Sequence, residues 1–199
     1  MTGLVVPFRG STGKSRLAPL QNRGRVSLAM LADVLAACVA VGRTTVVTGD
    51  EDAMVLAVGL DAHVLADPGG GQGPAVAAGL AATGERPVLV VNSDLAAATP
   101  RDLLDLLEAM PTRGMAIVEA RDGTTNALAI STPRLFAPLY GPGSAKRFRA
   151  HAEQRGIELV AAPIPNLVAD VDTPRDLARL DGSLRAHTRA AIASATVAP

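Results

Sequence analysis

Aromatic residues and cysteine are scarce in this sequence. Among its 199 residues, Phe, Tyr and Trp together make up 2%, tryptophan is absent, and Cys38 is the single cysteine. One cysteine excludes an internal disulfide framework and a cysteine-rich metal site, and the shortage of aromatic rings disfavours a surface on which nucleic-acid bases stack. Aliphatic side chains must therefore fill the core, a composition that suits a sheet covered by helices. We expect Cys38 to pack in this core as well.

Excess charge and long apolar segments are missing as well. The 19 basic and 19 acidic residues give a net charge of zero, so any anion site must be local. The sequence has no run of about twenty apolar residues and no basic leader followed by a hydrophobic stretch. We expect a cytoplasmic protein with no nucleic-acid or membrane partner, built as one domain over residues 1–182 with a fraying helical tail over 183–199.

Apolar residues alternate between runs typical of buried strands and the spacing of amphipathic helices. Strands are predicted at 4–6, 44–48, 62–66, 87–91, 115–119, 127–130 and 157–161. Helices are predicted at 25–41, 50–59 and 76–82, and after Thr99, Ser144 and Thr173. This order predicts an α/β domain with a parallel sheet and right-handed crossovers.

The opening segment, residues 3–20, has the composition of a phosphate-binding loop that follows a strand. Pro7 should end the strand, because proline brings no donor to a central ladder. Gly10 and Gly13 would let backbone amides approach an anion, and Lys14 and Arg16 add positive charge. A solvated basic turn is the simpler alternative.

A Walker loop does not account for this segment. The motif requires a glycine at the position that Phe8 occupies, and Pro19 lies where the helix after a Walker lysine would continue. The segment therefore predicts phosphate binding of another kind, without the γ-phosphoryl transfer that a Walker loop would suggest.

A second glycine-rich loop covers residues 67–75. Pro74 is compatible with the first position of the following helix, so the loop amides should face the same sheet edge as the opening loop. Gly71 and Gly73 are the candidates for nucleotide binding in this loop. A flexible surface turn is the alternative reading.

Aspartates follow two predicted extended segments. Asp94 comes just after the apolar run at 87–91, and ligands bind at the carboxyl ends of strands in open α/β sheets. Asp170 and Asp172 are two residues apart, so in extended geometry they project to the same side and can share a metal ion. Helix capping or turn formation is the alternative role for each of them.

Two further segments offer groups that bind anions. Residues 121–126 include Thr125 and Asn126, whose side chains are small neutral donors suited to a carboxylate or a phosphate. Residues 141–144 lead into a helix that begins with cations, which oppose the helix dipole unless an anion is bound there. Gly141, Gly143, Ser144, Lys146 and Arg147 therefore form a candidate anion pocket, with a solvated basic helix surface as the alternative.

Taken together, these segments resemble the guanylyltransferases that make coenzyme F(420). That family acts on 2-phospho-L-lactate or phosphoenolpyruvate and is related to the molybdenum-cofactor nucleotidyltransferases. The resemblance runs over about residues 3 to 181 and rests on Lys14 to Pro19, Asp94, Thr125 to Leu128, Gly141 to Ser144, and Asp170 to Pro174. It implies a single Rossmann-like domain of the nucleotide-diphospho-sugar transferase (GT-A) type, whose mixed, mostly parallel sheet has helices on both faces and one or two antiparallel later strands.

The resemblance also implies roles for particular residues. Magnesium would be held by Asp94, Asp170 and Asp172; the nucleotide by Pro7, Gly13, Lys14, Arg16, Gly71 and Gly73; and the acidic substrate by Thr125, Gly141 and Ser144. Lys14, Arg16 and Asp94 would act in catalysis. The chain has Gln72-Gly73 where the family usually has Leu-Asn, and Asn92-Ser93 leads into Asp94 where the family has a Gly-Asp-Leu-Pro step.

The expected reaction is transfer of GMP from GTP to the phosphate of a three-carbon phosphorylated acid, with release of pyrophosphate. No general base is needed, because a phosphate monoester is already mostly dianionic at pH 7. The acceptor remains open between phosphoenolpyruvate, 2-phospho-L-lactate and 3-phosphoglycerate, and the next enzyme of the pathway is a possible partner. Other readings are a molybdenum-cofactor guanylyl- or cytidylyltransferase, a sugar-phosphate nucleotidyltransferase, and a nucleotide-binding regulator without catalysis.

Overall fold

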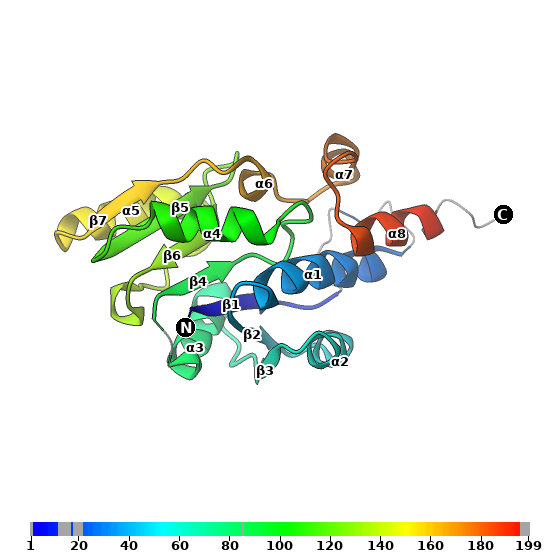
Figure 1. Cartoon of the computed structure of the whole chain (residues 1–199), viewed down its shortest axis with the longest axis horizontal. Helices are drawn as coiled ribbons and strands as arrows, with labels where there is room; N and C mark the ends of the chain where they lie inside the picture. Colours follow the sequence, from blue (N-terminus) through cyan, green and yellow to red (C-terminus); the bar gives the residue numbers. More distant parts are fainter. Residues whose placement is uncertain (1, 12–16, 18–21, 85, 196–199) are drawn as a thin grey trace.

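The computed structural model describes residues 2–11, 17, 22–84 and 86–195 and has one seven-stranded sheet (Figure 1). The strand order is β3-β2-β1-β4-β6-β5-β7. Every neighbouring pair is parallel except those made by β6, which runs antiparallel to β4 and to β5. The mixed sheet implied by the resemblance is therefore confirmed. The strands are β1 (Gly3–Phe8), β2 (Arg43–Thr48), β3 (His63–Ala66), β4 (Val88–Val91), β5 (Gly114–Glu119), β6 (Thr125–Ile130) and β7 (Glu158–Ala161).

The predicted helices are present, with ends that differ from the predictions by a few residues. The expected threonine caps are confirmed: the Thr99 and Thr173 side chains each accept a bond from the N–H three residues on, within a capping box. Two short elements, α6 and the 3₁₀ helix η2, were not predicted. The helices are α1 (Arg23–Val39), α2 (Glu51–Gly59), α3 (Gln72–Thr83), α4 (Pro100–Ala109), η2 (Pro133–Leu135), α5 (Ser144–Gln154), α6 (Pro165–Val168), α7 (Pro174–Arg179) and α8 (Ala186–Ala195).

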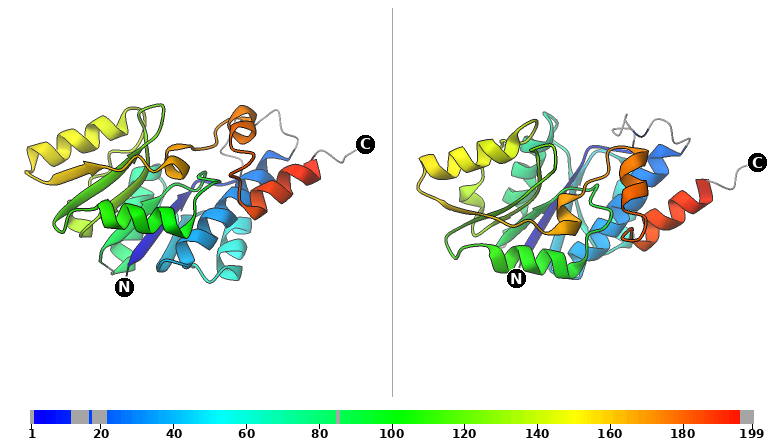
Figure 2. Two further views of the ribbon diagram at one scale, coloured as in Figure 1. Left: turned by 45° about the horizontal axis from the view of Figure 1, so that its top comes forward. Right: turned by 90° about the horizontal axis from the view of Figure 1, so that it is seen from above.

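Helices cover both faces of the sheet, and each face has its own apolar core. One core joins the sheet to α1, α2, α4 and α6 and contains Cys38. The other joins it to α3 and α5, and Figure 2 shows α5 and α4 on opposite sides of the strands. Gly79 lets α3 lie close to the sheet, since a Cβ there would collide with the Val5 side chain. This layering leaves the two ends of the strands as the places where a site can open.

Pro7 does not end β1, contrary to the prediction. The strand continues to Phe8, with Pro7 opposite Val47 of β2. The Gly3 N–H donates to the carbonyl oxygen of Pro87, on the β4 side, and alternate residues of a strand face alternate neighbours. Pro7 therefore faces the β4 side, where the ladder has already ended at Val5, so its missing N–H costs no ladder hydrogen bond.

Three other local predictions differ from the structure. Helix α3 begins at Gln72, with Gly71 as its N-cap at φ 94°, so Pro74 is the third helical residue. Its nitrogen still needs no intrahelical partner there. Strand β6 begins at Thr125 instead of 127. Residues 169–173, which contain Asp170 and Asp172, form a loop between α6 and α7 and no strand.

The C-terminal helix α8 packs along α1 at one end of the molecule (Figure 1). The carboxylate of Asp33, on α1, accepts hydrogen bonds from the backbone N–H groups of His187 and Thr188 at 3.0 and 2.8 Å. These N–H groups belong to the first turn of α8, which has no intrahelical acceptor for them. A buried side chain of α1 thus holds the start of the tail helix; the boundary at residue 182 stays a prediction.

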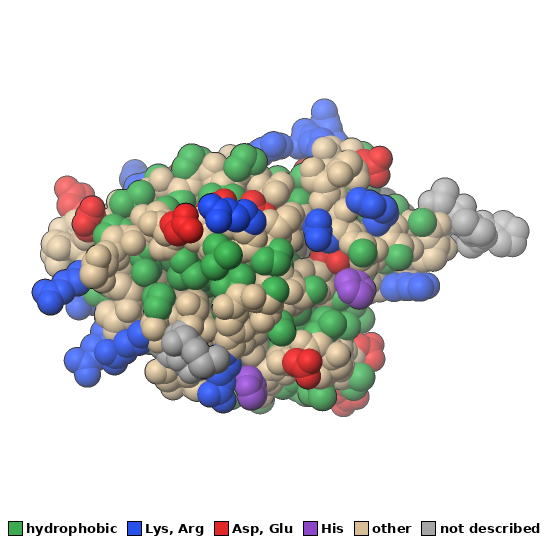
Figure 3. Space-filling view, in the orientation of Figure 1, with side chains coloured by type: hydrophobic (Ala, Val, Ile, Leu, Met, Phe, Trp, Pro, Cys, Tyr) green, Lys and Arg blue, Asp and Glu red, His purple; other side chains and the backbone are tan. Residues whose placement is uncertain are grey.

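The surface carries mixed charge. On the face shown in Figure 3, basic and acidic side chains lie scattered among hydrophobic and neutral ones, and the described residues there form no continuous basic patch. Among the described residues, no helix is both long and apolar enough to cross a membrane.

Candidate active site

A cavity of about 550 Å³ opens at the carboxyl ends of β1, β3 and β4. Its walls include the end of β1 with the residues after it (7–10), residues 67 and 69–72 after β3, and residues 92–94 after β4. Pro7 and Gly71, two of the predicted nucleotide-binding residues, line it. Three of the wall residues are consecutive glycines with positive φ between 80° and 94°, a backbone path that few other residues adopt. The cavity therefore has a wall made largely of exposed backbone.

The loop after β1 is anchored by Asp50, the N-cap of α2. Its carboxylate accepts hydrogen bonds from the backbone N–H and the hydroxyl of Ser11, at 2.8 and 2.9 Å, and caps the N–H of Ala53. Burial works to raise the pKa of Asp50, but the hydrogen bonds from Ser11 and Ala53 outweigh it and lower the pKa. The carboxylate of Asp50 therefore holds the opening loop against the start of α2 through Ser11.

The three predicted metal ligands lie together. Carboxylate oxygens of Asp94, Asp170 and Asp172 can be chosen that all lie within 4.8 Å of one another. The convergence has a backbone cause, because the N–H of Val171 donates to the carbonyl oxygen of Asp94 at 3.1 Å. Val171 is fully buried, so the loop is pinned between the two aspartates that flank it. Extended strand geometry, which the sequence suggested as the cause, is not what brings these residues together.

The other carboxylates of the acidic cluster affect the pKa of Asp170. Burial, together with the nearby carboxylates of Asp94 and Asp172, raises the pKa of Asp170 to about 6. The Asn126 amide, at 3.4 Å, acts in the opposite direction. Three carboxylates gathered in this way form a donor set of hard oxygen atoms, which suits Mg²⁺, Mn²⁺ or Ca²⁺ more than a metal that prefers nitrogen or sulfur.

A second, smaller cavity of about 190 Å³ adjoins the first. Thr125, Gly141 and Ser144, the three predicted acceptor-binding residues, all line it. The Ser144 hydroxyl donates to the Thr125 hydroxyl at 3.1 Å, and both residues are buried. Residues that line both cavities are Gln72, Asn92, Asp94 and Asp172. The two cavities therefore meet at the acidic cluster.

The antiparallel direction of β6 explains why its first residues reach this edge. Ala127 pairs with Val91 at the carboxyl end of β4, and the Asn92 N–H donates to the carbonyl oxygen of Asn126 at 3.0 Å. The start of α5 is tied to the same place, because the N–H of Ala145 donates to the carbonyl oxygen of Gly123 at 3.2 Å. A strand start and a helix start thus form the wall of the small cavity.

Some predicted site residues lie elsewhere or outside the described part of the chain. Gly13, Lys14 and Arg16 fall among residues that the structure does not describe. Gly73 is not among the described residues that line either cavity. A Cβ at Gly73 would come within 2.9 Å of the Cβ of Pro138. Glycine at this position is therefore explained by close packing of α3.

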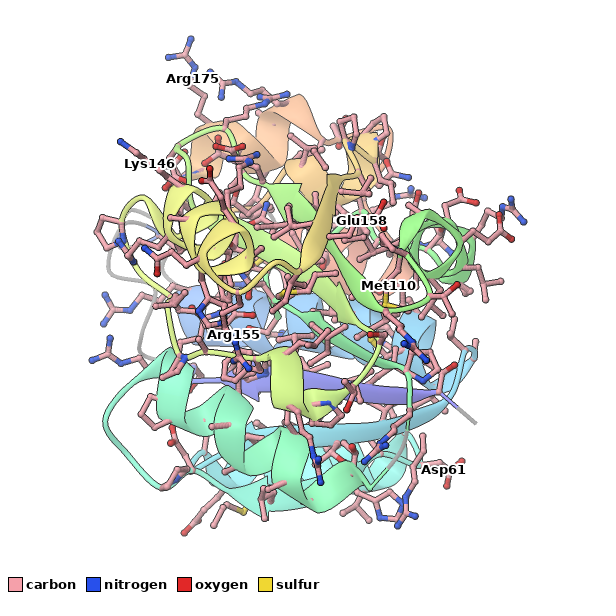
Figure 4. The ribbon with its side chains drawn as sticks, turned by 90° about the vertical axis from the view of Figure 1, so that its left-hand side faces the viewer. Asp61, Met110, Lys146, Arg155, Glu158 and Arg175 are labelled. Carbon is pink, nitrogen blue, oxygen red and sulfur yellow. The ribbon has the colours of Figure 1, made fainter. Side chains whose placement is uncertain are left out.

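The cations at the start of α5 do not line the small cavity. Arg147 donates to the carbonyl oxygens of Leu139, Tyr140 and Pro142, so its guanidinium holds the turn that leads into the helix. Lys146 is exposed and points outward from α5 in Figure 4. The wall of the small cavity is formed by neutral groups of this segment, Gly141 and Ser144, while its two cations lie outside the lining.

Gln72, Asn92 and Tyr140 line the cavities and had no role assigned to them from the sequence. Gln72 and Asn92 join through a hydrogen bond of 2.7 Å across 20 positions of sequence. Tyr140 lines the small cavity, and its hydroxyl is buried with no hydrogen-bond partner among the described residues. Burial raises the pKa of that hydroxyl. The sequence pointed to these three residues only through their position beside predicted site residues: Gln72 follows Gly71, Asn92 precedes Asp94 by two residues, and Tyr140 precedes Gly141.

Known proteins resemble this chain over most of its length. Residues 2–186 match the family model described as guanylyl transferase, CofC-like. A phosphoenolpyruvate guanylyltransferase from Geodermatophilus obscurus is 37% identical over 187 residues, which cover 87% of this chain and 85% of the relative. Another, from Nocardia farcinica, is 36% identical over 191 residues, covering 88% and 83%.

Solved structures share the fold. A crystal structure from Desulfovibrio desulfuricans G20, assigned as a nucleotide-diphospho-sugar transferase, superimposes with a TM-score of 0.77 at 16% identity, covering 97% of this chain and 94% of the other. A nucleotidyl transferase from Methanothermobacter gives a TM-score of 0.69 at 23% identity, covering 90% and 95%. The expected fold class is confirmed by this similarity.

Proposed function

The chain belongs to the family of CofC-like guanylyl transferases, and we propose that it transfers GMP from GTP to the phosphate of phosphoenolpyruvate or 2-phospho-L-lactate. Pyrophosphate is the second product. The observation that carries the proposal is the meeting of two cavities of different size at one acidic cluster. Such an arrangement suits a reaction in which a nucleotide and a small acid must bring their phosphates together.

The larger cavity is proposed to hold GTP. Its wall of glycine backbone, residues 69–71, allows close approach of peptide groups to a base or a ribose. Lys14 and Arg16 are proposed to bind the triphosphate, and Gly13 to give it backbone donors. All three continue the segment whose described start, from Pro7 to Gly10, lines the same cavity.

The acidic cluster is proposed to hold Mg²⁺. Its three carboxylates offer the hard oxygen ligands that this ion takes, and Mg²⁺ usually retains water and substrate phosphates as its other ligands. When bound, such an ion neutralises phosphate charge and aligns an in-line displacement. Asp94 has the central place, because its backbone carbonyl also fixes the loop that carries Asp170 and Asp172.

The smaller cavity is proposed to hold the three-carbon acid. At about 190 Å³ it is about a third as large as the larger cavity, of about 550 Å³, which suits the smaller of the two substrates. The hydroxyls of Thr125 and Ser144 and the backbone of Gly141 offer hydrogen bonds without adding charge. The acidic cluster beside them excludes an unaccompanied anion, so binding of the acid should depend on the metal ion.

In this reaction an oxygen of the acceptor phosphate attacks the α-phosphorus of GTP. The bond from the α-phosphorus to the bridging oxygen of pyrophosphate breaks, and that oxygen leaves with the electron pair. The nucleophile is already an anion at neutral pH, since the second pKa of a phosphate monoester is about 6. The chain therefore needs to align two anions, and no proton has to be removed. In the cell, the product would pass to the next enzyme of coenzyme F(420) biosynthesis.

Pyrophosphate release tests this proposal. Purified protein is incubated with GTP and Mg²⁺ and, in separate reactions, phosphoenolpyruvate, 2-phospho-L-lactate or 3-phosphoglycerate. We expect release that requires both GTP and one of the first two acids. The absence of release with all three acids, or equal release with CTP in place of GTP, would contradict the proposal.

A further inference from the structure

We propose that the carboxamide of Gln72 binds the acceptor phosphate, and that Asn92 positions Gln72 for this role. The inference rests on the proposed guanylyl transfer and adds a specific contact to it. Gln72 is the first residue of α3, and Asn92 is the first residue after β4. Both side chains line the large cavity and the small one, so they lie where the two substrates would meet.

The hydrogen bonds fix which way each amide points. The Nδ2 of Asn92 donates to the backbone carbonyl oxygen of Thr125 at 3.1 Å. A carbonyl oxygen can only accept, so the amino group of Asn92 must face Thr125 and its Oδ1 must face Gln72. That oxygen then accepts from the Nε2 of Gln72 at 2.7 Å. Reversal of the Asn92 amide would break both bonds, and reversal of the Gln72 amide would break its bond to Asn92.

This orientation leaves one N–H of Gln72 available. An amide nitrogen has two hydrogens, and among the described residues Asn92 is the only hydrogen-bond partner of the Gln72 side chain. The second N–H belongs to a side chain that lines both cavities, as Asp94 and Asp172 do. A donor in this position can bind an anion that lies between the nucleotide and the acid.

The chemistry of the junction favours a neutral donor there. Two phosphates must approach each other next to three carboxylates, so a negative side chain at this position would repel them. A positive side chain would compete with the metal ion for the carboxylates. An amide donates a hydrogen bond without changing the charge. Gln72 bonds Asn92, Asn92 bonds the backbone of Thr125, and the Thr125 hydroxyl bonds Ser144 in the small cavity. This sequence of contacts favours a role for Gln72 at the acceptor.

Substitution of Gln72 tests the contact. Gln72→Leu removes the donor at similar volume, and Gln72→Glu replaces it by a negative acceptor. We expect Gln72→Leu to raise the KM for phosphoenolpyruvate by about tenfold to 100-fold, the range for a hydrogen bond to a charged group, and Gln72→Glu to raise it further. The KM for GTP should change by less than about twofold, and the melting temperature should be unchanged. Gln154→Leu, on the exposed end of α5, is the matched control and should match the wild type.

Asn92→Ala separates positioning from contact. It frees the Gln72 amide, so the KM for the acid should rise, and the double substitution with Gln72→Leu should cost less than the sum of the two single effects. Additive effects, an unchanged KM for the acid in Gln72→Leu, or an equal rise for GTP and the acid would overturn the inference.

Binding measurements keep this result apart from failure of the proposed reaction. Calorimetric titration of phosphoenolpyruvate into protein with Mg²⁺ and a GTP analogue whose α,β-bridging oxygen is replaced by a methylene group gives a dissociation constant for each variant. If the wild type releases pyrophosphate but Gln72→Leu binds the acid equally well, the inference alone is wrong. If the wild type neither turns over nor binds the acid, both proposals are wrong.

Discussion

The backbone N–H of Val171 donates to the carbonyl oxygen of Asp94 at 3.1 Å. This single bond joins the segment after β4 to the loop before α7, and it does so between Asp170 and Asp172. Because Val171 is fully buried, the loop cannot rotate freely about this point. The acidic cluster is therefore held by the backbone before any cation binds.

Replacing Asp94 by asparagine should abolish metal-dependent turnover. The amide keeps the shape of the side chain but removes the charge that a cation needs, so we expect a loss of at least 100-fold in kcat, with thermal unfolding close to that of the wild type. Asp181→Asn, in the exposed turn after α7, is the matched control. Activity within threefold of the wild type would remove Asp94 from the proposed site.

Stabilisation by Mg²⁺ should increase with pH. The pKa of Asp170 in the metal-free fold is about 6, against an ordinary value of 3.8. The folded state thus holds this proton more tightly than the unfolded state, and the resulting stability is complete below about pH 4 and is lost as pH rises through about 6. A cation binds the deprotonated form, so its stabilising effect should grow over the same range.

Thermal unfolding with and without Mg²⁺ at about pH 5 and pH 7.5 measures this difference. We expect a larger rise in melting temperature at the higher pH for the wild type, and a small rise at both values for Asp170→Asn. An equal rise at both pH values in the wild type would contradict the assignment of the carboxylate as a ligand.

Removing the hydroxyl of Ser144 should weaken binding of the acid. The hydroxyl is fully buried and donates to Thr125 at 3.1 Å, so Ser144→Ala removes one of the groups proposed to bind the acceptor. We expect kcat/KM for phosphoenolpyruvate to fall by about tenfold while the KM for GTP stays the same. Ser194→Ala, on α8, controls for loss of a serine hydroxyl, and an equal loss for both substrates would argue for a general disturbance of the fold.

Replacing Asp33 by alanine should destabilise the protein without changing its chemistry. The substitution leaves the N–H group of His187, which is partly buried, and that of Thr188, which is buried, without their acceptor. We expect the free energy of unfolding to fall by about 1–3 kcal/mol in chemical denaturation. Asp181→Ala should change it by less than about 0.5 kcal/mol. Equal effects of the two substitutions would show that Asp33 does not hold α8.

The sequence predicts those features of the fold that depend on neighbouring residues. The caps at Thr99 and Thr173 follow from side chains that bond three residues away, so local sequence was sufficient. The position of Asp94 at a strand end followed from a buried apolar run and the general placement of ligands in such sheets. Asp170 and Asp172 were also placed together, although the cause is a loop pinned at Val171.

Features that depend on distant partners could not be predicted in this way. Pro7 is accommodated inside β1 because the β4 ladder ends two residues earlier, which no local pattern reveals. Gly73 is required by contact with Pro138, 65 positions away. The resemblance to a family implied one or two antiparallel later strands but did not say that β6 is the reversed one, since a parallel and an antiparallel buried strand have similar apolar patterns.

The products made from GTP and phosphoenolpyruvate labelled with ¹⁸O in its phosphate test the central claim most directly. If the acceptor phosphate attacks the α-phosphorus, mass spectrometry will show a guanosine diphosphate ester of the three-carbon acid that retains all of the label, together with unlabelled pyrophosphate. Formation of GDP, or appearance of the label in pyrophosphate, would contradict the account.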